Sequence, residues 1–390
     1  MAHEIAIVGG GVAGTVLANR LADELRTEIQ DGRATVTLYT DDPTHVYKPL
    51  FLYVAFGRKR VEEAYRDERD LLDGDIDLVV ASVTEIDVDA KTLKLDGAKP
   101  TDTGGAKPEH ETVEYDTLAI GTGADLAPEA VPGLEDAHHF YGRAGAEALR
   151  EALAGFEGGD VVLTVAGMPH MCPVAPVEFA FMVQEWLAER GVDADVTYTY
   201  PIDAVHAKDA LANWLPERFA ERGIKTETEF EVASFDGTDG AGTVEAEDGR
   251  TVEGDLVVAI PPHTGSDLIA DSGLGDPWID VDRHTLEAES ADDVYAVGDA
   301  AAVPTSKAGS AAHYQTGALA RRIGSRVRGE TPTAQYDGKT FCFVETGLEE
   351  ATYIEFGYDE EPAVPEPSRY IHWAKLSYNE SYWLTARGLV

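Results

Sequence analysis

The chain has 390 residues, of which 44% are hydrophobic, and its 72 acidic and 31 basic residues give a formal net charge of −41 at pH 7. This apolar content is sufficient for two or three cored domains of an ordinary α/β protein. A negative field of this size repels the phosphates of nucleic acid and of anionic lipid headgroups, so we expect no nucleic acid partner.

The acidic residues occur in short groups, such as DDP at residues 41–43 and ESADD at residues 289–293, and do not gather in one tail. This scatter indicates a solvated acidic surface. The composition resembles that of proteins from halophiles, whose cytosol holds molar salt that screens charges over roughly 3 Å.

The chain starts with MAHEIAIVGGG, which leads directly into a strand and a loop and lacks the charged, apolar and small regions of a signal peptide. No apolar stretch approaches the roughly 18 residues of a membrane-spanning helix, so we expect a cytosolic chain. Its two cysteines, Cys172 and Cys342, are too few for a secreted disulfide framework or a thiolate metal site, and we expect no metal ion.

The N-terminal segment EIAIVGGGVAGTVLANRLADEL predicts a strand, a glycine loop and a helix, and ATVTLYTDD follows as the second strand of a βαβ unit. Gly9 permits a tight turn, Gly11 lets a pyrophosphate approach the backbone, and Gly14 lets the helix pack against the strand. Thr40 stands where an acidic residue usually binds the ribose. Asp41, one residue later, is therefore the candidate for that role.

Two later segments belong to the same nucleotide site. VEYDTLAIGTGADLAP, at residues 113–128, predicts a strand that enters a turn containing Thr122 and Gly123. ADDVYAVGDAAAVP, at residues 291–304, predicts a strand that ends on Gly298 and Asp299, whose carboxylate can bind a ribityl hydroxyl. With the glycine loop, these segments look like the FAD-binding framework of flavoprotein reductases that have two dinucleotide-binding domains.

That resemblance covers almost the whole chain and implies an α/β fold with two Rossmann-like, three-layer dinucleotide-binding domains. It implies an FAD-binding domain of residues 1–135 and 262–325, a second Rossmann-like domain of residues 136–261, and a C-terminal region of residues 326–390. The C-terminal region is predicted to associate with a membrane.

The second domain departs from the pattern of NADH-using reductases, which carry another G-x-G-x-x-G loop after its first strand. Here the strand DVVLTVA is followed by GMPHMCPVAPVE, at residues 167–178, in which only Gly167 remains. Prolines 169, 173 and 176 remove backbone N–H groups that a phosphate needs. We therefore expect this domain to have the fold without the bound nucleotide.

Both cysteines lie in segments that resemble one family. CPVAPVE, at residues 172–178, and YDGKTFCFVETG, at residues 336–347, resemble the redox-cysteine segments of sulfide:quinone oxidoreductases and of flavocytochrome c sulfide dehydrogenases. The resemblance implies that Cys172 and Cys342 are redox partners on opposite sides of a flavin ring. A lone cysteine in an apolar strand is otherwise usually a packing residue.

The residue types around Cys172 suit sulfur chemistry. A cysteine at a strand-to-helix junction points toward a helix N-terminus, whose dipole favours the reactive thiolate. Glu178, six residues further on, could move protons if apolar surroundings raise its pKa, or could simply complement the helix dipole. His170 and His206 are candidates for positive groups that steer an anionic substrate, or are exposed loop residues.

The resemblance implies a reaction. Hydrosulfide attacks a Cys172–Cys342 disulfide or a polysulfide bridge, one cysteine leaves as a thiolate, and two electrons pass through FAD to a membrane quinone. Zero-valent sulfane sulfur or polysulfide is the product. Because both cysteines are used, none remains to attach the flavin, and FAD is expected to be non-covalent.

Further residues are assigned through the resemblance. Lys307, before a predicted helix, could stabilise an anionic reduced flavin. Lys48 and Pro49 lie in HVYKPLFLYVAFG, which looks like the segment that packs on the flavin ring, although its aromatic residues could equally form core.

The C-terminal stretch SRYIHWAKLSYNESYWLTARGLV is rich in Tyr and Trp, which suit a membrane interface. In the family this end attaches to the membrane as a monotopic segment and opens toward the quinone. Phe343, Tyr370 and Trp373 are the candidates for the quinone site. An aromatic interface in a homo-oligomer is the alternative, and the expected location is the cytoplasmic face of the cell membrane.

Two other functions remain open. A type II NADH:quinone oxidoreductase shares the FAD framework and the membrane end, but it needs an intact second nucleotide loop. A flavin protein without turnover could use the cysteine pair as a reversible redox sensor.

The acidic surface predicts a stability that depends on salt. We expect the melting temperature to fall steeply as KCl is lowered from molar to millimolar concentrations, because unscreened carboxylates repel one another. A thermal melting series in KCl measures this, and a melting temperature that does not change with salt would contradict the halophilic interpretation.

Overall fold

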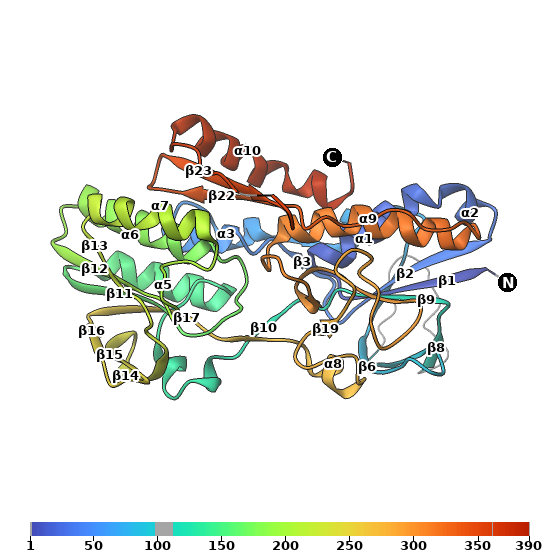
Figure 1. Ribbon diagram of the computed structural model, residues 1–390, viewed down its shortest axis with the longest axis horizontal. Helices are drawn as coiled ribbons and strands as arrows, with labels where there is room; N and C mark the ends of the chain where they lie inside the picture. Colours follow the sequence, from blue (N-terminus) through green and yellow to red (C-terminus); the bar gives the residue numbers. More distant parts are fainter. Residues whose placement is uncertain (1, 98–111, 361, 390) are drawn as a thin grey trace.

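Two parallel sheets organise the chain, and each lies between helices on one face and a small antiparallel sheet on the other (Figure 1). The structure is a computed structural model that describes residues 2–97, 112–360 and 362–389. The domain limits predicted from the sequence remain predictions. The structure itself shows which strands share each sheet.

The first sheet has five parallel strands, in the order β20, β9, β1, β2, β5. Their bounds are Val294–Ala296, Thr117–Ile120, His3–Val8, Ala34–Thr40 and Asp77–Val80. Helices α1 (Val12–Glu24) and α9 (Gly309–Val327) pack together on one face. On the other face lie β6 (Ser82–Asp87), β7 (Thr92–Asp96) and β8 (Thr112–Glu114). Burial on both faces explains the continuous apolar run of β1.

The second sheet has four parallel strands, in the order β13, β12, β11, β17. Their bounds are Ile224–Glu227, Ala194–Thr199, Gly159–Val165 and Leu256–Ile260. Helices α5 (Arg143–Gly155), α6 (Ala175–Glu189) and α7 (Asp209–Glu221) pack with it in one core. The antiparallel strands β14 (Val232–Thr238), β15 (Ala241–Ala246) and β16 (Thr251–Gly254) cover the other face.

The chain ends in a hairpin, β22 (Thr340–Glu345) and β23 (Ala351–Phe356), and in the helix α10 (Arg369–Ala386). In Figure 1 the hairpin and α10 lie along the top of both halves. In the described residues, no helix is both long and apolar enough to cross a membrane. The remaining short elements are β3 (Thr44–Val46), β4 (Tyr65–Asp67), β10 (Asp125–Leu126), β18 (His263–Thr264), β19 (Ile279–Asp280), β21 (Ala301–Ala302), α2 (Arg26–Gln30), α3 (Leu50–Ala55), α4 (Glu68–Leu71), α8 (Asp267–Asp271) and the 3-10 helices Val61–Ala64, Pro128–Ala130, Leu134–Asp136 and Gly298–Ala300.

Buried polar contacts attach α10 to the first half. The Asn19 amide on α1 donates to the backbone carbonyl of Ala386 at 3.0 Å, and its side-chain oxygen accepts from the Asp73 amide at 2.8 Å. The Tyr382 hydroxyl lies 2.6 Å from His45 Nε2, and His45 Nδ1 lies 3.1 Å from the Glu68 carboxylate. These side chains are buried, so the end of α10 is held by hydrogen bonds that water cannot replace easily.

Asn19 provides a test of this attachment. We expect Asn19→Ala to lower the free energy of unfolding by about 1–3 kcal/mol, because it leaves buried backbone groups without partners. Asn213→Ala, at an exposed position on α7, is the matched control and should change it by less than about 0.5 kcal/mol. Urea unfolding in molar KCl measures both, and equal effects would contradict the assignment.

Candidate active site

A cavity of about 1100 Å³ lies where both halves and α10 meet. Its walls include the glycine loop before α1, the turn after β9, the segment that leads into α9, the loop after β11, β22 and one face of α10. Of the residues predicted for the site, the cavity is lined by Gly9, Gly11, Asp41, Lys48, Pro49, Thr122, Gly123, Cys172, Glu178, Gly298, Asp299, Lys307, Cys342 and Phe343.

The glycine loop has the geometry of a nucleotide loop. Gly9 has φ of +108°, and a Cβ on Gly14 would lie 1.9 Å from the Gly9 carbonyl oxygen, so neither position tolerates a side chain. A Cβ on Gly11 would meet no atom within 4 Å, which leaves the backbone open to a ligand. Asp41 is exposed directly after β2, which ends at Thr40, and can reach a ribose at that edge of the cavity.

Polar groups without protein partners face the same cavity. Thr122 Oγ1 is buried and has no hydrogen-bond partner among the described residues. Gly298 has φ of +73°, and a Cβ there would lie 2.9 Å from Ala13 Cβ. Burial raises the pKa of the Asp299 carboxyl, whereas Lys307 and Lys48 oppose this rise. Such groups suit a ligand rich in hydroxyls, and FAD fits this donor and acceptor set.

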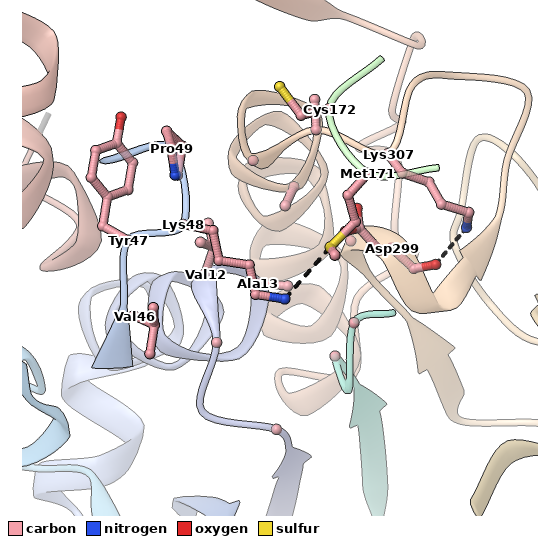
Figure 2. A pocket seen from close by; sticks show the side chains of 18 of the residues that line it. Val12, Ala13, Val46, Tyr47, Lys48, Pro49, Met171, Cys172, Asp299 and Lys307 are labelled. Atoms are coloured by element: carbon pink, nitrogen blue, oxygen red, sulfur yellow. Dashed lines mark hydrogen bonds between the residues drawn. The ribbon is translucent and has the colours of Figure 1, made fainter. Parts of the chain in front are cut away.

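Two lysines lie on either side of the cavity (Figure 2). Lys307 Nζ donates to the Asp299 carbonyl oxygen at 2.5 Å and lies 3.4 Å from the centre of the Trp278 ring. Burial lowers the pKa of Lys307 to about 8, and Asp299 partly opposes this. Lys48 Nζ lies 3.5 Å from the sulfur of Met171. Lys48 and Pro49 are exposed at this wall, whereas the aromatic residues Tyr47, Phe51 and Tyr53 of the same segment are buried in the core.

The loop after β11 is bound to the first half of the molecule. The Cys172 amide donates to the Lys307 carbonyl oxygen at 2.7 Å, and Met171 forms an isolated β-bridge with Lys307. The Tyr141 hydroxyl donates to the Met171 carbonyl oxygen at 2.9 Å. Cys172 has φ of +45°, a left-handed conformation that a turn imposes. The loop thus places a sulfur atom beside the first half.

The two cysteines are free thiols that line the same cavity. Cys172 lies in the loop before α6, and Cys342 lies in β22. Burial is the main cause that raises the pKa of the Cys172 thiol, and the nearby Cys342 and Glu178 groups raise it further. Burial also raises the pKa of Cys342 to about 11, although the Ser310 hydroxyl opposes this. Burial therefore opposes the thiolate that a helix N-terminus would favour at Cys172. Lys375 lowers the pKa of both thiols.

Glu178 belongs to a buried ionic cluster that the sequence did not indicate. Its carboxylate accepts from the Lys375 ammonium and from the Glu345 backbone amide at 2.7 Å. Burial raises the pKa of Glu178, whereas Lys375 opposes this rise. Glu345 also accepts from the Tyr53 hydroxyl at 2.5 Å and lies 2.9 Å from His372 Nδ1. The cluster connects the cysteine site to α10 through groups that can hold protons.

Helix α10 presents two faces, and its aromatic residues are divided between them. Lys375, Tyr378 and Tyr382 line the cavity, with helical spacings of three and four residues. Tyr370 and Trp373 are 78% and 57% exposed and do not line it, so the structure does not bring them together with the other predicted site residues, and their assignment to the quinone site stays a prediction. Phe343 does line the cavity. The step of five residues from 373 to 378 separates the two faces.

His170 and His206 are not exposed positive groups. Both side chains are buried, and burial lowers the pKa of His170 to about 4 and that of His206 to about 3. Both imidazoles are therefore neutral near pH 7 and do not attract an anion. Among the described residues, no group of three or more His, Cys, Asp or Glu side chains is placed to hold a metal ion.

Comparison with known proteins relates this geometry to a family. Mitochondrial sulfide:quinone oxidoreductase from Mus musculus is 23% identical over 374 residues, which cover 92% of this chain and 79% of that protein. The structure of sulfide:quinone oxidoreductase from Aquifex aeolicus matches with a TM-score of 0.82 at 20% identity, covering 99% of this chain and 92% of that one. The resemblance noted from the cysteine segments is thus confirmed.

NDH2 from Plasmodium falciparum, solved in complex with NADH, has a related fold, with a TM-score of 0.70 at 11% identity, covering 99% of this chain and 98% of that one. The family model for pyridine nucleotide-disulphide oxidoreductases matches residues 3–324. Because this match spans most of the chain, the protein belongs to the pyridine nucleotide-disulphide oxidoreductase family.

Proposed function

We propose that the protein is an FAD-dependent sulfide:quinone oxidoreductase, which oxidises sulfide to sulfane sulfur or polysulfide and reduces a membrane quinone. The observation that carries this proposal is the meeting of Cys172 and Cys342 in the cavity that also contains the glycine loop. Two cysteines beside a dinucleotide loop, once joined by a disulfide or a sulfur bridge, supply a sulfur acceptor next to the site of a two-electron acceptor. The similarity to mitochondrial sulfide:quinone oxidoreductases supports the same function.

The cysteines carry the sulfur chemistry. Hydrosulfide attacks a disulfide between Cys172 and Cys342, or a sulfur chain that bridges them, forming one S–S bond and releasing the other cysteine as a thiolate. Closing the bridge again, with one sulfur atom more, releases two electrons. Bound FAD supplies two-electron transfer to the quinone.

The remaining residues position the cofactor without a covalent bond, since both cysteines act in the reaction. Asp41 and the glycine loop are assigned to the adenosine and pyrophosphate end, and Thr122, Gly123, Gly298 and Asp299 to the ribityl chain. Lys48, Pro49 and Lys307 are assigned to the flavin ring, where a cation stabilises negative charge.

The cluster of Glu178, Lys375 and Glu345 is assigned to proton transfer and to thiolate stabilisation. Burial lowers the pKa of Lys375. The two carboxylates of Glu178 and Glu345 together raise this pKa by more, so the net shift is upward and the ammonium stays charged. This charge lowers the pKa of both thiols, which favours the leaving thiolate. Glu178 is placed to pass on the protons that the quinone takes up.

The outer face of α10 is assigned to the membrane. Tyr370 and Trp373 are exposed on this face. Leu384 on α10 and Tyr314 on α9 are 52% and 39% exposed and also line the cavity, which places an opening of the cavity beside them. An apolar surface beside a cavity opening suits a peripheral protein that receives a quinone from the bilayer, with Phe343 inside. The proposed location is the cytoplasmic face of the cell membrane, and an aromatic homo-oligomer interface is the alternative.

Anaerobic reduction of the flavin tests the proposal. In molar KCl we expect sulfide to bleach the flavin absorbance and a soluble quinone to restore it. Cys172→Ser and Cys342→Ser should each abolish bleaching by sulfide, because the attacked bridge cannot form. Met168→Ala, at an exposed position of the same loop, is the control and should bleach normally. Bleaching by NADH alone would contradict the proposal, and bleaching without quinone reduction would favour a redox sensor.

Glu178 can be tested by separating the two half-reactions. We expect Glu178→Gln to leave bleaching by sulfide within about tenfold of the original rate and to slow quinone reduction by roughly 10²-fold or more, because it removes a proton donor. Glu185→Gln, on the same helix but paired with Arg222 outside the cavity, is the matched control. Stopped-flow rates measure both steps, and equal slowing of both variants would argue against the role.

A further inference from the structure

The helices that flank the cavity opening lack the acidic residues found elsewhere. The chain has 72 acidic residues in 390, yet α9 has none in its 19 residues and α10 has only Glu380 in its 18. Glu380 is itself paired with Lys59 Nζ at 2.5 Å. These two helices therefore contribute almost no negative charge to a protein of net charge −41.

The guanidinium groups of Arg20 and Arg321 lie near each other in this region, and neither is paired with a carboxylate among the described residues. A Cβ on Gly317 of α9 would lie 3.1 Å from Arg20 Nη1 and 3.9 Å from Arg321 Nη1, so both guanidinium groups border that glycine. Within the described residues, no carboxylate lies within 4.0 Å of either. By contrast, the nearby Arg326 pairs with Glu287 at 2.7 Å and Arg328 pairs with Glu24 at 2.6 Å.

The surroundings of the pair suit an anion. Burial is the main cause that lowers the pKa of Arg20. The positive charge of Arg321 lowers it further, as expected for two cations held close together. His313 Nε2 is buried without a partner, and burial, followed by Arg20, lowers the pKa of His313 to about 4. The imidazole of His313 is therefore neutral near pH 7 and adds no further positive charge beside Arg20.

The pair lies far along the helices from the nucleotide end. Arg20 follows Gly11 by nine residues, which is about 13.5 Å along α1. Arg321 follows Gly309, the first residue of α9, by twelve residues, or about 18 Å. Arg20 lines the far end of the cavity, so a phosphate bound there is separated along α1 from the phosphates of a dinucleotide at the glycine loop.

Exposed apolar residues adjoin the pair. The end of α10 lies against α1 here, because a Cβ on Gly388 would lie 3.3 Å from Asn19 Cβ and 3.9 Å from the Arg20 amide nitrogen. Leu384 and Leu389 in this segment are 52% and 66% exposed. Cations next to exposed leucines match the boundary between phosphate headgroups and acyl chains.

We propose that Arg20 and Arg321 bind the phosphate of an anionic membrane lipid beside the cavity opening. The inference rests on the proposed membrane attachment and adds a headgroup preference to it. Composition alone predicted repulsion of anionic lipid, but molar salt screens charges over roughly 3 Å, so direct contacts decide the outcome. A bidentate guanidinium–phosphate contact persists under these conditions better than a diffuse field.

Vesicle binding in molar KCl tests this inference. The probes are vesicles of phosphatidylcholine alone and vesicles in which one third is phosphatidylglycerol. We expect the protein to bind the second kind more tightly and Arg20→Gln with Arg321→Gln to lose most of the difference, roughly fivefold for each arginine. Binding to phosphatidylcholine should remain, because the apolar residues are unchanged. The melting temperature should not fall, since each substitution relieves a repulsion.

Arg150→Gln with Arg190→Gln, on α5 and at the end of α6 in the second half, is the control with the same change of charge, and it should keep the preference. A double variant that still prefers phosphatidylglycerol overturns the inference. A change of oligomeric state without vesicles, on gel filtration, would assign the pair to a second copy of the chain instead. Vesicle binding does not require turnover. If sulfide fails to bleach the flavin, the proposed function is contradicted, but the vesicle-binding result can still be interpreted.

Discussion

The ammonium of Lys375, buried between the carboxylates of Glu178 and Glu345, is the interaction on which the site depends. The three groups come from α10, α6 and β22, which are far apart in sequence. Burying one of them alone would cost several kcal/mol, and each is tolerated because the others are present. The C-terminal hairpin and α10 are therefore held on the second half, which places Cys342 in the same cavity as Cys172.

Electrostatics act on two scales in this protein. The net charge of −41 is a property of the whole surface, and molar salt reduces its range to roughly atomic dimensions. Local arrangements are then what a ligand meets. The buried cluster holds a cation beside two thiols, and α9 and α10 expose a surface with almost no acidic residues. The total charge predicts solubility and salt dependence, whereas these local groups determine which anions can bind.

The sequence by itself determined the features that depend on neighbours along the chain. The glycine loop with Gly9 and Gly14 follows from backbone geometry, which only glycine satisfies at such close approaches. The strands, the helix that begins near residue 175 and the loop around Cys172 follow from apolar periodicity and from prolines. The departure of that loop from a second nucleotide loop was also evident, because prolines lack the N–H groups that phosphate needs.

Only the tertiary structure decided how distant segments meet. The burial of His170 and His206, which keeps them neutral, depends on the packing of other elements around them. The face of α10 that lines the cavity depends on its partners, and for this reason the sequence alone did not separate Tyr370 and Trp373, which lie outside the cavity, from Tyr378 and Tyr382. The pairing of Lys375 had no sequence signal beyond one lysine in a helix. Charge and burial depend on neighbours in space, which patterns along the chain do not specify.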